Sequence, residues 1–123
     1  MLKVLTLALS AAAVPAPQAS SPPFACRANA LDKAQRQRQQ VLLQTARRAM
    51  VGKQELPNGL VLSFPADAGI FVQLAEWISL ERRCCPFLEF ALEWKRDDSV
   101  SVRLTGEAGV KQFIAAEMGI TMD

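Results

Sequence analysis

Three cysteines are the residues of this sequence best suited to chemistry. Cys84 and Cys85 are adjacent, and Cys26 is the only other thiol. Histidine and tyrosine are absent, which removes the commonest general base and excludes Ser/His/Asp and Cys/His catalysis. Any acid, base or nucleophile must therefore be a carboxylate, a lysine, a hydroxyl or one of these thiols.

A set of thiols without imidazole favours a soft, thiophilic ligand. Cys84 and Cys85 would form only a strained ring if they bonded to each other, so they are better suited to sharing a third atom. Thiolates in a trigonal set fit mercury, arsenite or cuprous copper, and with Glu81 as a fourth ligand they fit zinc. The sequence thus predicts a soft metal or metalloid site made of Cys26, Cys84, Cys85 and Glu81.

Two other uses of the thiols stay open. A disulfide from Cys26 to Cys84 or Cys85 would close a loop of about 60 residues and stabilise a non-catalytic interaction domain by about 4 kcal/mol. The remaining free thiol, or all of them together, would suit thiol redox work. The sequence favours a binding protein over an enzyme: it indicates no catalytic residue and no certain cofactor beyond a soft ion.

Glu81 is the polar residue that stands among apolar ones. Leu74, Trp77 and Ile78 recur at helical spacing between Asp67 and Pro86, which predicts a helix with one apolar stripe. The stripe contains Ile70, Leu74, Ile78 and Cys85, with Glu81 near its middle, and its margins hold Phe71, Trp77 and Cys84. A buried carboxylate must accept hydrogen bonds, meet a cation, stay protonated or line a cavity. The alternative to a ligand role is an ion pair with Arg47, Arg82 or another surface arginine, or a bond to a neighbouring backbone amide.

The N-terminus has the layout of a secretory signal. Lys3 precedes an apolar run from Val4 to Val14, which is followed by small and turn-forming residues. The run is too short to span a bilayer, so we expect no stable membrane span in the mature chain. We predict a signal peptide over 1–19, a flexible segment over 20–28 that carries Cys26, and one domain over 29–123. The protein is expected in the periplasm or outside the cell.

The charge pattern excludes nucleic acid as the favoured partner. The formal net charge is +2, and 14 basic and 12 acidic residues are mixed along the chain. Such a pattern gives no broad positive field to attract phosphate backbones. The partner expected from the sequence is therefore a thiophilic ion, and no protein partner is indicated.

Hydrophobic periodicity predicts an α+β fold. Helices are expected at Lys33–Met50, from Asp67 to Pro86, and after Gly109; strands are expected at 59–64, 88–95 and 100–105. The order is α-β-α-β-β-α, and the economical arrangement is a two-layer sandwich with a small three-stranded sheet and helices on one face. If the first two strands are parallel neighbours, the residues between them suit a right-handed crossover.

One stretch of the chain resembles a small family of uncharacterised bacterial proteins. The run from Glu81 to Phe90 matches their E-R-x-C-C-P-F-x-x-F signature, and Leu104 to Phe113 is similar to the L-T-G-x-x-G-x-K-x-F element that follows it. The similarity covers about Leu74 to Phe113. In the second element this chain lacks the proline that the family pattern suggests before the acidic residue Glu107, and this departure lies in a loop. The resemblance implies no established activity; the paired thiols suggest heavy-metal handling.

Overall fold

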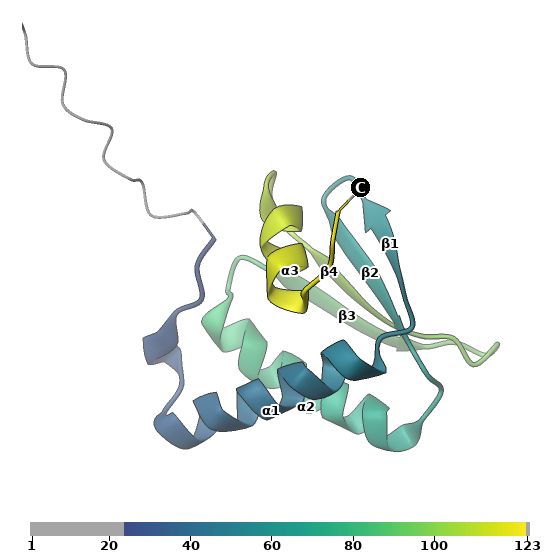
Figure 1. The fold of residues 1–123 in the computed structure, drawn as a ribbon, viewed down its shortest axis with the longest axis horizontal. Coiled ribbons are helices and arrows are strands. Elements are labelled where there is room, and N and C mark those ends of the chain that lie inside the picture. The colour runs from purple at the N-terminus through teal and green to yellow at the C-terminus, as the bar shows by residue number, and fades with distance from the viewer. Residues whose placement is uncertain (1–23, 123) are drawn as a thin grey trace, which may run out of the picture.

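The computed structural model describes residues 24–122 (Figure 1). The predicted α+β class is confirmed. In chain order the elements are a short 3₁₀ helix η1 (Ala28–Ala30), α1 (Lys33–Ala49), β1 (Gly52–Leu56), β2 (Gly59–Phe64), α2 (Ala68–Cys84), β3 (Glu89–Trp94), β4 (Val100–Thr105) and α3 (Val110–Met118). The predicted signal peptide lies outside the described residues. Over 24–122, no helix is both long and apolar enough to cross a membrane.

The sheet corrects the prediction. Over the described residues it has four strands rather than three, in the order β1-β2-β4-β3, with every neighbouring pair antiparallel. The strand missing from the prediction is β1, an edge strand whose residues are mostly exposed. Its sequence, GKQEL, has no alternation of apolar and polar residues, so periodicity cannot reveal it. The element order is therefore α-β-β-α-β-β-α.

The strand neighbours also exclude the conditional crossover. The first two predicted strands, β2 and β3, are not paired, because β4 lies between them and pairs antiparallel with both. β1 instead forms a hairpin with β2, with Leu56 opposite Gly59 and a two-residue turn at Pro57 and Asn58. Turn-forming residues at this point were recognisable in the sequence, but they join two strands instead of opening the first one.

The helices cover one face of the sheet (Figure 1). Side chains along β2 and β4 alternate, and the buried set faces the helices. Members of that set are Leu60, Leu62, Phe64, Val100, Val102 and Leu104. The same core receives Leu42 of α1, Leu74 and Trp77 of α2 and Ile114 of α3. The fold thus places α1, α2 and α3 around one buried core.

Side-chain caps set the starts of the two long helices. Asp32 accepts from the Gln35 amide at 2.8 Å, and the Gln35 side chain accepts from the Asp32 amide at 3.0 Å, which forms a capping box for α1. Asp67 accepts from the Ile70 amide at 2.8 Å and caps α2. Both caps confirm the starts that the sequence predicts.

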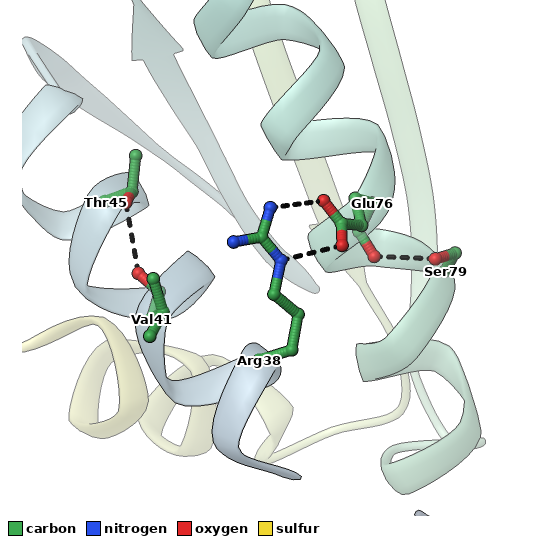
Figure 2. A network of polar contacts seen from close by, with 5 residues as sticks. All are labelled: Arg38, Val41, Thr45, Glu76 and Ser79. Carbon is green, nitrogen blue, oxygen red and sulfur yellow. Dashed lines mark hydrogen bonds and ion pairs between the residues drawn. The ribbon is translucent and has the colours of Figure 1, made fainter. Parts of the chain in front are cut away.

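An ion pair on the surface joins α1 to α2 (Figure 2). Arg38 donates from Nε to Glu76 Oε1 at 2.8 Å and from Nη2 to Glu76 Oε2 at 2.7 Å. Both side chains are partly exposed to solvent: that of Arg38 is 46% exposed and that of Glu76 is 41% exposed. Such a bidentate pair fixes the relative rotation of two helices more than it stabilises them. It helps to keep the inner faces of α1 and α2 in register.

Candidate functional site

The thiol pair closes α2 and lies in the core. Cys84 is the last residue of the helix, and the Cys85 amide donates to the Glu81 carbonyl at 2.8 Å. Pro86 follows and cannot continue the helical hydrogen bonding. Cys84 is 1% exposed and Cys85 is not exposed at all. Both predicted ligands are therefore present side by side in a water-poor interior.

The N-terminal segment brings Cys26 to this pair. The Arg27 amide donates to the Cys84 carbonyl at 2.9 Å, and Arg83 Nη2 donates to the Ala30 carbonyl at 2.8 Å. The rings of Phe24 and Phe87 pack with their centroids 5.2 Å apart. The segment thus runs across the end of α2, and its thiol comes against the thiols that close the helix.

The surroundings of Cys26 raise the pKa of its thiol. Loss of solvent raises the pKa of its thiol to about 12; hydrogen bonding to Cys84 and the Cys84 charge raise the pKa too, whereas a hydrogen bond with Cys85 lowers it. Cys26 is nevertheless exposed, whereas Cys84 and Cys85 are buried. All of the cysteines are free thiols.

Glu81 is fully buried and is held by neutral groups. Gln39 Nε2 donates to Glu81 Oε2 at 2.8 Å, and Cys85 Sγ donates to Glu81 Oε1 at 3.4 Å. Cys84 Sγ lies 3.9 Å from Gln39 Oε1, which completes a chain of side chains from α1 to the thiols. Among the described residues Glu81 forms no salt bridge, so the expected alternative of a pair with Arg47 or Arg82 is not what satisfies it.

Glu117 of α3 is a member of the site that the sequence analysis missed. Ligand atoms of Glu81, Cys85 and Glu117 all lie within 4.8 Å of one another. Desolvation raises the pKa of Glu117 to about 9, hydrogen bonding to Glu81 and the Glu81 charge raise it too, and Arg47 lowers it. The Arg47 guanidinium donates to the backbone carbonyl of Glu117, from Nε at 2.8 Å and from Nη2. At neutral pH Glu117 therefore holds a proton.

A signal for Glu117 was present in the sequence. It falls on the stripe formed by Val110, Ile114 and Met118, as Glu81 does on its own helix. The same test that identified Glu81, a carboxylate on an apolar stripe, identifies Glu117 when it is applied to the last helix. The two carboxylates that interrupt apolar stripes are thus the two that meet in the core.

The thiols of Cys26 and Cys85 are protonated at neutral pH. Burial raises the pKa of Cys85, and the charges of Glu81, Glu117 and Cys26 raise it as well. A thiol in such surroundings is a poor nucleophile, since the thiolate is the reactive form. The arrangement is therefore suited to ligation by an ion that displaces thiol protons, and less suited to rapid thiol exchange with disulfides.

Two hollows flank the end of α2. One, of about 430 Å³, is lined by the loop after Cys85, including Pro86 and Phe87, and by Asn58, Thr105 and Glu107. The other, of about 450 Å³, is lined by Arg27, Asn29, Ala30 and Arg83. The second hollow adjoins the exposed side of the segment that carries Cys26.

Comparison with known proteins identifies no relative. No protein-family model matches the chain, and no curated protein or solved structure matches it either.

Proposed function

We propose that this is an exported thiol protein that binds a soft metal or metalloid ion through Cys26, Cys84 and Cys85, with the Glu81 carboxylate beside the ion. The observation that carries the proposal is that the segment bearing Cys26 crosses the end of α2, where the Arg27 amide donates to the Cys84 carbonyl at 2.9 Å. Cys26 therefore lies beside the thiol pair, although it is far from it in the sequence. Among the described residues, the ligand atoms that lie within 4.8 Å of one another are those of Glu81, Cys85 and Glu117, so Cys26 and Cys84 must move closer to bind the same ion. A trigonal sulfur environment is one that soft ions prefer. Export is supported by the sequence pattern of the first residues.

The carboxylates support the same proposal. Binding of a cation by three thiols releases protons and leaves negative charge in a buried site. Glu81 Oε1 already accepts from the Cys85 thiol at 3.4 Å, so it can take up the position of a fourth ligand or accept a displaced proton. A hard oxygen-ligated ion such as magnesium has little reason to prefer this sulfur-rich set.

The alternatives account for fewer of these contacts. Thiol redox work is served by thiols of lowered pKa, whereas the pKa values of Cys26 and Cys85 are raised by burial. A plain structural disulfide would use two of the thiols and leave the third buried or exposed without a role. It also gives no reason for placing Glu81 and Glu117 beside Cys85.

The decisive experiment counts the thiols that an ion protects. The natively exported protein is alkylated with and without reductant, and with and without one equivalent of mercury(II) or arsenite, and the intact mass is measured. We expect the exposed thiol of Cys26 to react in the folded protein without an ion and to be protected when the ion is bound. In urea, where the buried thiols become accessible, we expect all three to react without an ion and to be protected together by the bound ion. The same spectrum gives the mass of the mature N-terminus and so tests the predicted signal peptide.

The other outcomes point elsewhere. A stable disulfide from Cys26 to Cys84 or Cys85 in the exported protein, with one thiol that reacts regardless of the ion, would contradict ion binding and favour the interaction domain. Reversible conversion between thiols and disulfide at physiological potentials would favour redox work. Magnesium is the matched control ion and should protect none of the thiols.

A further inference from the structure

The hollow lined by Arg27, the residue that follows Cys26, carries positive charge. Two of its lining residues are Arg27 and Arg83. Arg27 follows Cys26 directly and Arg83 precedes Cys84 directly, so each arginine adjoins one of two thiols that interact with each other. The Arg83 guanidinium is held at the wall by its hydrogen bond to the Ala30 carbonyl.

No carboxylate neutralises this charge within residues 24–122. The salt bridges there are those of Arg38 with Glu76 and of Lys111 with Glu55, and Arg27 and Arg83 have no further partner. The hollow therefore offers two guanidinium groups and the Asn29 amide to a ligand. Guanidinium groups match carboxylates in shape and charge and bind them with paired hydrogen bonds.

A soft ion reaches a protein as a complex with thiols, because thiolates are the ligands it prefers. Cys84 and Cys85 are buried, whereas Cys26 is exposed, so Cys26 is the sulfur that an incoming complex meets first. Resting on the function proposed above, we propose that the hollow binds the carboxylates of an anionic low-molecular-weight thiol carrying the ion, and thereby positions the ion for transfer to Cys26.

The transfer is a ligand exchange without oxidation or reduction. The sulfur of Cys26 forms a bond to the ion, the bond between the ion and one carrier sulfur breaks, and the Cys26 proton leaves on the carrier as its thiol. A second exchange with Cys84 releases the second carrier thiol in the same way. Because the Cys26 thiol already interacts with Cys84, the ion moves inward without leaving the protein.

The test compares carriers that differ in charge. Mercury(II) is supplied to the reduced full chain as its complex with mercaptosuccinate, which carries carboxylates, with mercaptoethanol, which is neutral, or with cysteamine, which is cationic. Trp77 is buried on α2 one turn before Glu81, so quenching of its fluorescence by the heavy atom reports arrival of the ion. The substitution Trp94→Phe removes the only other tryptophan.

We expect Arg27→Ala to slow transfer from mercaptosuccinate by about threefold, and Arg27→Ala with Arg83→Ala to slow it by about tenfold, as for the loss of solvent-exposed ion pairs. Added salt should slow the unsubstituted protein similarly. Transfer from mercaptoethanol should not change, and transfer from cysteamine should become faster. Arg96→Ala is the matched control, since Arg96 lies in the β3–β4 turn on the opposite side of the molecule (Figure 1).

Two results separate this proposal from the ion-binding function. Transfer to the unsubstituted protein from every carrier, with no dependence on the charge at positions 27 and 83, would overturn the role of the hollow and leave ion binding intact. No transfer from any carrier would contradict ion binding itself. Equal slowing of all three carriers by Arg27→Ala would also overturn the proposal, because it would show an effect on the position of Cys26 instead of on charge.

Discussion

The backbone amide of Arg27 donates a hydrogen bond to the carbonyl oxygen of Cys84, 2.9 Å away. The last carbonyls of a helix lack partners within the helix, so this bond satisfies one acceptor at the end of α2. It also fixes the residue next to Cys26 against the residue that begins the thiol pair. A backbone hydrogen bond therefore holds Cys26 near the thiol pair, and no bond between the sulfurs is needed for this.

Cys26→Ser should separate ion binding from folding. Cys26 is exposed, so we expect the free energy of unfolding to change by no more than about 0.5 kcal/mol. We expect the affinity for mercury(II) to fall by at least about tenfold, because the loss of even an outer-shell partner of a metal ligand has effects of that size. Competition with a chelating dithiol measures the affinity, and urea unfolding checks the fold. Unchanged affinity would remove Cys26 from the site.

Gln39→Ala should destabilise the protein through Glu81. Gln39 Nε2 donates to Glu81 Oε2 at 2.8 Å in a buried position, so the substitution leaves a buried acceptor without this donor. We expect a loss of about 1–3 kcal/mol in urea unfolding. Gln37→Ala, an exposed change in the same helix, is the control and should have little effect. Equal effects of the two substitutions would show that Glu81 does not depend on Gln39.

Glu117 should make stability depend on pH. Its pKa rises from an ordinary 4.5 to about 9 in the folded protein, so between these values the folded chain holds a proton that the unfolded chain has lost. The free energy of unfolding should then fall as pH rises across this interval, by at most about 1.4 kcal/mol per pH unit. Stability from this group is complete below pH 4.5 and is lost as pH passes about 9.

Glu117→Gln should remove most of that pH dependence. Urea unfolding under reductant at several pH values measures it, and Glu107→Gln, which changes an exposed carboxylate, is the matched control. The pKa of the Cys26 thiol, about 12, lies above the interval and does not interfere. A pH dependence that survives Glu117→Gln unchanged would assign the proton to another group.

Gly59→Ala should disrupt the pairing of β2 with β4. A Cβ atom at Gly59 would lie 1.9 Å from the Leu104 carbonyl oxygen, which is backbone and cannot move aside without shifting a central strand. We expect a loss of at least about 2 kcal/mol, toward the upper range for overpacking. Gly52→Ala is the control, because its Cβ would make ordinary contacts with Ser63 at 3.7 Å. Thermal or urea unfolding compares the two.

The parts of the fold that the sequence predicts are those with strong periodicity. Along Gly59–Phe64 and β4, buried residues alternate with less buried ones. β3 alternates between apolar and polar residues in its sequence, although its residues are half-buried or exposed, and α2 has an apolar stripe that ends before Pro86. β1 escapes prediction because it is an exposed edge strand stabilised by pairing with β2, and pairing leaves no pattern in its own residues. The order of the strands also depends on contacts between them, which leave no pattern in the sequence.

The site, like the fold, has residues that the sequence predicts and contacts that it does not. Glu81 is identifiable from the sequence because a carboxylate on an apolar stripe is expected to be buried, which is costly without a partner. In the structure it is fully buried. The stripe itself is rotated from the prediction: Trp77 and Cys84 lie at its buried centre, whereas Ile70 and Ile78 are only half-buried. The meeting of Cys26 with Cys84, and of Glu117 with Glu81, depends on how helices pack, which single-helix periodicity does not contain.

The aromatic contacts of the N-terminal segment extend beyond it. Phe24 packs on Phe87, and Phe87 packs edge-on against Phe113, with centroids 5.1 Å apart. Phe113 lies one turn before Glu117 on α3. A continuous row of ring contacts thus connects the segment that bears Cys26 with the helix that bears Glu117. Removal of the Phe87 ring, which lies between the other two, would break this connection.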